Sequence, residues 1–347
     1  MKKLKRIVAL GIVAGSLFFA SCSSDDNATA EISLGQYEDG VFVLNEGNTA
    51  PTSGSVSFIS NNGAVENDVF SNVNPNEASA GSFLQNLFFD DTRAFIISGQ
   101  ANKVTVVDRY TFKFIATVDA NFTNPRYGTV ANGKAYVTNA GTSWGLGTDD
   151  FITVIDLSNY STSQIAMGNF SERILEENGK VYVLNGYYDG GTSITVVNPA
   201  ANSIEKTIEL GFSPNSFEEE NGTLYVIGSG KLAKINTTTN TLDGTALTIT
   251  ANSKNIQIED GKIYYTVANA VYAMNLNATV APASPLFSYN STSADGVMYG
   301  FAVNDDTIYI SDAGDFSSNT NVYLYSLTGT LSKTIPTGVA PNGFYFN

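Results

Sequence analysis

Asn178-Gly179, followed by Val181-Tyr-Val-Leu-Asn185, is one of seven copies of a short pattern that runs through this chain. In each copy an Asp/Asn-Gly or Asp-Asp pair precedes a short, strand-like segment with an aromatic centre. The pairs begin at residues 39, 90, 132, 178, 221, 260 and 305, so successive copies are 51, 42, 46, 43, 39 and 45 residues apart. Asn-Gly and Asp-Gly accept the positive φ angles of type I′ turns, so each pair predicts a two-residue hairpin between antiparallel strands.

One unit of the repeat contains four predicted strands. In the unit that starts at Lys180 they cover residues 181–185, 193–198, 204–210 and 216–220. A period of 40 to 50 residues with four strands per unit is typical of a β-propeller blade, and no segment of the body has a sustained helical period. The sequence therefore predicts an all-β, seven-bladed propeller; six or eight blades fit the repeat less well.

The ends of the chain predict how the ring closes. The first unit begins at the strand after Asp39-Gly40 and lacks the innermost strand that precedes the turn in the other units. Residues 341–347, Pro-Asn-Gly-Phe-Tyr-Phe-Asn, read as that missing strand. We expect the C-terminal strand to pair with residues 41–45, which closes the first blade and removes open sheet edges.

The N-terminus predicts export and lipidation. Lys2, Lys3, Lys5 and Arg6 precede an apolar run over residues 7–20, which is short for a permanent span and ends just before Cys22. Residues 1–21 are thus predicted to be a lipoprotein signal peptide, residues 22–35 a lipidated flexible tether and residues 36–347 the propeller. Leu17-Phe-Phe-Ala-Ser-Cys22 resembles a bacterial lipobox, with Cys22 as the lipidated residue. A secreted protein with a stray cysteine is the alternative.

Charge and composition exclude several classes of partner and chemistry. Loss of the four basic residues of the signal peptide changes the formal net charge from −15 to −19, which disfavours nucleic acid and anionic lipid headgroups. The chain has no histidine, and Cys22 is its only cysteine, so His-dependent triads, His-ligated zinc and thiolate catalysis are excluded. We expect a protein that is not an enzyme and has no catalytic residues and no cofactor. Lactonase-like hydrolysis is disfavoured for the same reason.

Acidic pairs are frequent, but most need no functional explanation. Residues 176–177 and 218–220 stand just before Asn-Gly pairs, where a solvated strand end is the ordinary explanation. Residues 312–321 are rich in oxygen ligands, so a calcium site is conceivable there. The stretch lacks the glutamate that closes an EF-hand loop, so a plain loop is favoured and no metal site is predicted.

A ligand is expected on the propeller face that carries the long loops. The short hairpins occupy the opposite face, and the long-loop face combines aromatic rings with amides, which suits a large ligand of little charge and many hydrogen-bonding groups. Packing within loops or between blades is the alternative role for each of these residues. The expected ligand contacts are Trp144, Tyr187, Tyr188, Tyr127, Arg126, Asn139, Asn185, Asn45 and Arg173.

A family resemblance extends these expectations. Ala135-Tyr-Val-Thr-Asn139 and Val181-Tyr-Val-Leu-Asn185, each with its following strand, resemble the YVTN repeat of bacterial seven-bladed propellers such as YncE. With the lipobox and the acidic residues that follow it, the mature chain resembles surface propeller lipoproteins of the Bacteroidetes, including the BtuG-type proteins that capture cobalamin and cap a TonB-dependent transporter. The repeat is specific for fold, and none of the family's ligand residues can be transferred by position.

Two classes of function follow. The resemblance implies a lipid-anchored protein on the outer face of the outer membrane, which captures a nutrient such as a corrinoid and passes it to a TonB-dependent receptor. The alternative is a cell-surface scaffold whose rim binds another protein or a glycan. The sequence does not name the ligand.

Overall fold

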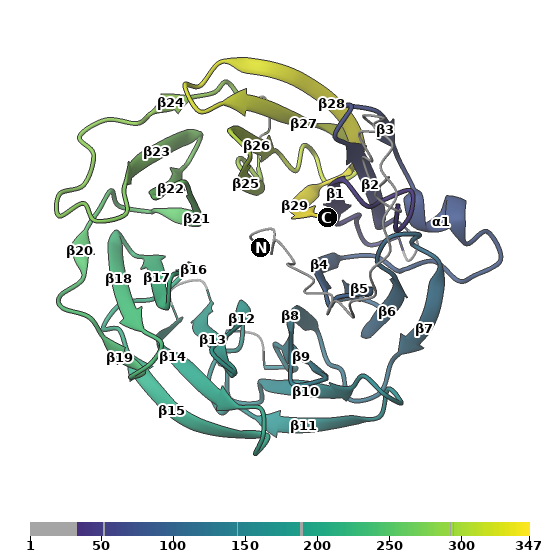
Figure 1. Ribbon diagram of the computed structural model, residues 1–347, viewed down its shortest axis with the longest axis horizontal. Coiled ribbons are helices and arrows are strands. Elements are labelled where there is room, and N and C mark those ends of the chain that lie inside the picture. The colour runs from purple at the N-terminus through teal and green to yellow at the C-terminus, as the bar shows by residue number, and fades with distance from the viewer. Residues whose placement is uncertain (1–32, 51–52, 144, 188–189, 292, 294) are drawn as a thin grey trace, which may run out of the picture.

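Seven small antiparallel sheets stand around a central axis, as the computed structural model in Figure 1 shows. The structure describes residues 33–50, 53–143, 145–187, 190–291, 293 and 295–347. The expected all-β, seven-bladed propeller is confirmed. The predicted signal peptide and Cys22 lie outside the described residues, as does the tether up to residue 32.

Each blade runs from an inner strand beside the axis to an outer strand at the circumference (Figure 1). In order from blade 1 to blade 7, the inner strands are β29 (Pro341–Phe346), β4 (Leu84–Phe89), β8 (Pro125–Ala131), β12 (Ile174–Glu177), β16 (Ser216–Glu220), β21 (Lys254–Glu259) and β25 (Gly300–Asn304). The second strands are β1 (Gly40–Asn45), β5 (Arg93–Ser98), β9 (Lys134–Asn139), β13 (Lys180–Tyr187), β17 (Thr223–Gly228), β22 (Lys262–Val267) and β26 (Thr307–Ser311).

The outer half of each blade is less regular. The third strands are β2 (Ser55–Ser60), β6 (Lys103–Asp108), β10 (Phe151–Asp156), β14 (Gly190–Asn198), β18 (Lys231–Asn236), β23 (Ala270–Asn275) and β27 (Asn319–Ser326). The outer strands are β3 (Val65–Glu66), β7 (Phe114–Val118), β11 (Thr162–Ala166), β15 (Ser203–Glu209), the two pieces β19 (Thr241–Leu242) and β20 (Leu247–Thr248), β24 (Phe287–Ser288) and β28 (Leu331–Val339).

The C-terminal strand closes the ring as predicted. β29 pairs antiparallel with β1, with Val43 opposite Phe344, and so supplies the inner strand of blade 1. The Ser311 hydroxyl donates to the Pro341 carbonyl at 2.6 Å, which ties β29 to blade 7. The Asn347 side-chain amide also donates to the Tyr37 carbonyl. The first strand, β1, and the last strand, β29, therefore belong to one sheet.

The two-residue turns follow the predicted chemistry in five of the seven units. Both residues have positive φ at the pairs that begin at residues 132, 178, 221, 260 and 305. Asp90-Asp91 is different: Asp90 accepts hydrogen bonds from the backbone amides of Thr92 and Arg93, so its side chain organises a longer turn. The Asp39-Gly40 pair joins no two strands of its blade, because the inner strand there arrives from the C-terminus. For these two units the prediction of a two-residue hairpin was wrong.

A short helix occupies part of the insertion after blade 1. α1 (Val69–Val73) buries Val69 and Phe70 against a core cluster that includes Phe112 of blade 2. Five residues are too few to leave a helical period in the sequence, so this element was not anticipated.

The hydrophobic cores lie between neighbouring blades. Because successive side chains of a strand point to opposite faces, Tyr182 and Leu184 of β13 pack toward blade 5, whereas Val181 and Val183 pack toward blade 3. Each blade thus shares one apolar layer with the blade before it and another with the blade after it. This arrangement accounts for the largely buried second strands.

The tyrosine of the repeat also makes a polar contact between blades. The Tyr182 hydroxyl donates toward the Thr237 carbonyl at 3.1 Å and Asn240 Oδ1 at 2.6 Å, in the turn between the third and outer strands of blade 5. Tyr136 makes the same contact with Pro199 and Asn202 of blade 4. We call this contact the tyrosine clamp, and it gives the repeated tyrosine a structural role.

The clamp predicts a difference between two equivalent tyrosines. Tyr182→Phe should lower the free energy of unfolding by about 1–3 kcal/mol, because it leaves buried acceptors in blade 5 without their donor. The matched control is Tyr225→Phe in the next blade, where the hydroxyl makes no hydrogen bond with a described residue. Tyr225→Phe should unfold in urea at nearly the wild-type midpoint. Equal losses of unfolding free energy in the two variants would contradict the clamp.

Candidate functional site

The inner strands begin on the long-loop face and stand around the central axis (Figure 1). Several polar side chains from different blades meet there. We call them the channel-mouth cluster, which consists of Glu46, Gln85, Arg126, Glu172, Tyr299 and Asn342.

One half of the cluster joins blades 7, 1 and 2. The Tyr299 hydroxyl, just before β25, donates to a carboxylate oxygen of Glu46, which follows β1. Asn342 of β29 donates to the same oxygen at 3.4 Å and to the Leu84 carbonyl at 2.7 Å. Burial raises the pKa of Glu46, while Tyr299 and Arg126 act in the opposite direction. Burial and the Glu46 carboxylate raise the pKa of Tyr299, which keeps its hydroxyl a donor.

Arg126 organises the other half. At the start of β8, its guanidinium donates to Gln85 of β4 and, at 3.2 Å, to Glu172 just before β12. It thereby links blades 2, 3 and 4. The Tyr127 ring lies between two cations, 5.8 Å from the Arg126 guanidinium and 5.1 Å from that of Arg173. Arg126, Tyr127 and Arg173 were all expected ligand contacts, and the structure brings them together.

The three expected asparagines lie inside the blades. Asn45, Asn139 and Asn185 are each 0% exposed at the ends of second strands. Asn45 donates to Ser57, Asn139 donates to Thr153, and Asn185 accepts from Thr195 across to the third strand. In this structure they fasten strands and loops together and do not reach the channel mouth.

Two of the expected aromatic ligand contacts, Trp144 and Tyr188, lie outside the residues that the structure describes. Their contacts with a ligand remain predictions. Tyr187 is the last residue of β13 and pairs through its backbone with Gly190 of β14. β13 and β14 thus both extend beyond the pairing of Asn185 with Ser193.

Most other acidic residues serve local structure. Glu176 and Glu219 accept hydrogen bonds from the backbone amides of Gly179 and Gly222 and so support the hairpin turns. Asp315 accepts from the Ser317 and Ser318 amides within its loop, and residues 319–321, which were also expected to lie in a loop, belong to β27. Among the described residues, no group of three or more acidic, histidine or cysteine side chains is placed to hold a metal ion.

Asp150 is an exception because it is buried beside the cluster. It is 5% exposed, and its carboxylate accepts from the Ser171 amide at 2.9 Å. Burial raises the pKa of Asp150 to about 6, and the nearby Glu172 adds to the effect. The exposed Asp149 next to it has its pKa lowered to about 2 by hydrogen bonds from Thr142 and Ser143.

Of the six members of the cluster, only Arg126 was an expected ligand contact; Glu46, Gln85, Glu172, Tyr299 and Asn342 were not. Gln85 and Asn342 are the second residues of β4 and β29, as Arg126 is of β8, and Glu172 stands two residues before β12. That position in every repeat is a signal that could have found them.

The fold defines a class: this is a seven-bladed β-propeller with a cluster of polar side chains at the start of its inner strands. No helix among the described residues is long and apolar enough to cross a membrane. The chain belongs to the family described as "Domain of unknown function (DUF5074)", whose model matches residues 39–346.

Solved structures share the fold at low sequence identity. A quinonprotein alcohol dehydrogenase-like protein from Bacteroides thetaiotaomicron VPI-5482 is 16% identical, with a TM-score of 0.66 over 89% of this chain and 78% of that one. BamB from Moraxella catarrhalis is 15% identical, with a TM-score of 0.57 over 89% and 86%. The hydrazine synthase of Kuenenia stuttgartiensis is 17% identical, with a TM-score of 0.56 over 73% and 86%. No curated protein matches the sequence significantly.

The buried carboxyl of Asp150 predicts a pH-dependent stability. The pKa of Asp150 in the folded protein, about 6, lies above the ordinary 3.8. The free energy of unfolding is therefore undiminished by Asp150 at low pH and falls as the pH rises from about 4 to about 6, where the buried carboxyl must ionise. Asp150→Asn should therefore gain about 1–3 kcal/mol over wild type at pH 7 and little at pH 4. Chemical denaturation at both pH values measures this. Asp149→Asn is the control and should give no gain at pH 7, and a pH-independent effect at Asp150 would contradict the assignment.

Proposed function

We propose that this chain is a lipid-anchored surface protein that captures a nutrient at its channel mouth and passes it to a TonB-dependent transporter in the outer membrane. The observation that carries the proposal is the channel-mouth cluster, because it gathers polar groups from blades 1, 2, 3, 4 and 7 on the face that also carries the long loops. Propeller ligands commonly lie where the loops of several blades converge.

The charges of the cluster favour a ligand with little net charge. Arg126 is paired with Glu172, and the Glu46 carboxylate accepts from Tyr299 and Asn342, so the ions are already compensated inside the protein. A strongly charged ligand would have to break these pairs, at a cost in free energy. A large ligand rich in amide groups, such as a corrinoid, could instead exchange hydrogen bonds with Gln85 and Asn342 and pack against the Tyr127 ring.

Binding is favoured over catalysis for this site. The Glu46 and Glu172 carboxylates are both held in hydrogen bonds, and the chain supplies no histidine to act as a base. Cys22 would hold the propeller at the outer face of the outer membrane through its acyl chains. Protease treatment of intact cells measures that display directly: a propeller that is digested supports it, and one that is fully protected rules it out.

A second candidate function is a protein- or glycan-binding scaffold. The outer edges of blades 5 and 6 favour it, because β19, β20 and β24 have only two residues each. Leu242, Val280 and Leu286 are exposed in this region, with Val280 at 76%. Short outer strands beside exposed apolar side chains leave part of the third strands accessible to a partner.

Calorimetric titration with cyanocobalamin, haem and a glycan panel tests the capture proposal. We expect saturable binding of cyanocobalamin, and Trp144→Ala and Tyr187→Ala should each weaken it at least roughly thirtyfold, because aromatic anchors typically contribute about 2 kcal/mol or more. Ile115→Ala, an exposed apolar residue on the outer strand of blade 2, is the matched control and should bind like wild type. Glycan binding without corrinoid binding would favour the scaffold, and equal losses at Ile115 would place the site elsewhere.

A further inference from the structure

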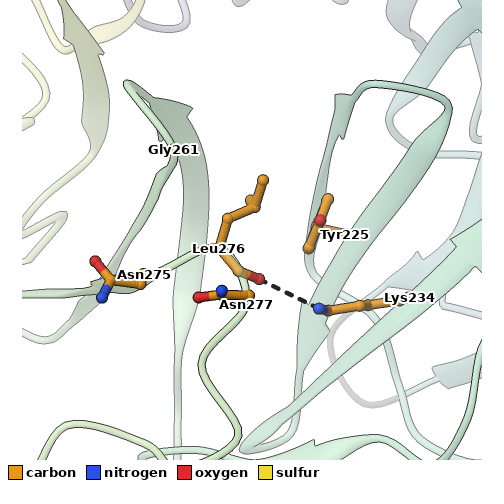
Figure 2. A pocket seen from close by; sticks show the side chains of 6 residues that line it. All are labelled: Tyr225, Lys234, Gly261, Asn275, Leu276 and Asn277. Atoms are coloured by element: carbon orange, nitrogen blue, oxygen red, sulfur yellow. Dashed lines mark hydrogen bonds between the residues drawn. The ribbon is translucent and has the colours of Figure 1, made fainter.

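A pocket lies on the hairpin face, between blades 5 and 6. Its volume is about 380 Å³, and it is lined by Tyr225, Lys234, Gly261, Asn275, Leu276 and Asn277. Figure 2 shows Tyr225 and Lys234 on the blade 5 side, with Asn275, Leu276 and Asn277 on the blade 6 side. The channel-mouth cluster is on the opposite face, so this pocket is independent of the proposed capture site.

The pocket stands where the repeat would place a tyrosine clamp. Tyr225 is the tyrosine of the β17 strand, as Tyr182 is of β13. In blade 5 the clamp partner Asn240 follows the strand-end residue Asn236 by four positions and has φ 53°. The same spacing from Asn275 in blade 6 reaches Thr279, which does not have positive φ. The turn of blade 6 therefore takes another course and leaves the clamp position open.

Tyr225 keeps a hydrogen-bonding group without a partner at this point. The residue is 6% exposed, and its hydroxyl makes no hydrogen bond with any residue that the structure describes. Lys234 lies directly opposite it in the β17–β18 pair, with its ammonium 5.2 Å from the centre of the Tyr225 ring. The ammonium also donates to the Leu276 carbonyl at 3.2 Å, which holds it at the pocket wall (Figure 2).

The surroundings keep the phenol protonated. Burial raises the pKa of Tyr225, and the carboxylates of Glu220, Asp243 and Glu219 add to the rise. The hydroxyl is thus a donor at neutral pH. These carboxylates oppose the charge of the Lys234 ammonium at the pocket wall, so charge selects neither an anion nor a cation and a neutral acceptor suits Tyr225.

We propose that this pocket binds a neutral ligand that carries a secondary amide. In the two intact clamps the tyrosine donates to a backbone carbonyl and to the side-chain carbonyl of an asparagine, which are both amide oxygens. An incoming amide would place its oxygen at the Tyr225 hydroxyl and its N–H toward the side-chain oxygens of Asn275 or Asn277. The volume falls within the range of small-molecule sites.

Two sources carry this group: a peptide bond and an acetamido sugar. Ligand-observed and protein-observed NMR titrations of the mature chain can distinguish them, with N-acetylalanine methylamide and N-acetylglucosamine as probes. Glucose, which lacks the amide, is the ligand control. We expect saturable shifts for at least one amide probe at residues 275–277 and none for glucose.

The variants test whether the phenol makes the contact. Tyr225→Phe should weaken amide binding at least about fivefold, the equivalent of one hydrogen bond, whereas Tyr182→Phe makes the same change at an occupied clamp and should leave binding unchanged. Binding of the sugar alone identifies an acetamido glycan as the ligand class, and binding of the dipeptide analogue identifies a peptide. The proposal is overturned if neither probe binds, if glucose binds as well as the amides, or if Tyr225→Phe binds like wild type. Because the two sites lie on opposite faces, absence of amide binding at this pocket would leave the proposed binding of cyanocobalamin unaffected.

Discussion

The pairing of β29 with β1 is the interaction on which the rest of the structure depends. Without it blade 1 has no inner strand, and β1 presents an unpaired edge toward the axis. The pairing also builds the channel mouth, because Asn342 lies on β29 and Glu46 directly follows β1. It reaches the next blade too, since Asn86 of β4 donates to the Tyr345 hydroxyl at 3.1 Å. Ring closure therefore also assembles the half of the cluster that contains Glu46, Tyr299 and Asn342.

The two faces of the ring have different chemistry for a simple geometric reason. Five of the seven hairpin turns have two residues, so that face is repetitive, and tyrosine clamps join blade 3 to blade 4 and blade 4 to blade 5 through the same atoms. The long-loop face carries no such repeat, and its polar contacts differ from blade to blade. Function is expected where the repeat is absent, at the channel mouth, or where it is interrupted, as at the junction of blades 5 and 6.

Much of the fold could be predicted because turn chemistry and strand alternation are local. Asn178-Gly179 and its equivalents specify where hairpins occur, and the missing inner strand before Asp39 specifies how the ring closes. The site was harder to predict because its contacts are distant in sequence: Arg126 and Glu172 are 46 residues apart, and Glu46 and Tyr299 are 253 apart. The asparagines at strand ends were misleading, since an amide that fastens two strands and an amide that binds a ligand look alike in a sequence. Asp90 shows the same ambiguity, because its carboxylate can replace a glycine turn by capping the backbone itself.

Calorimetric unfolding of a chain that lacks residues 341–347 tests ring closure most directly. The truncated protein should lose its cooperative transition or aggregate, because Phe344 leaves the apolar layer between blades 7 and 1 and the edge of β1 is exposed. The control is Leu331→Ala on the outer strand β28, where the side chain is 49% exposed and the transition should stay close to wild type. A truncated chain that unfolds cooperatively at the wild-type temperature would contradict the account.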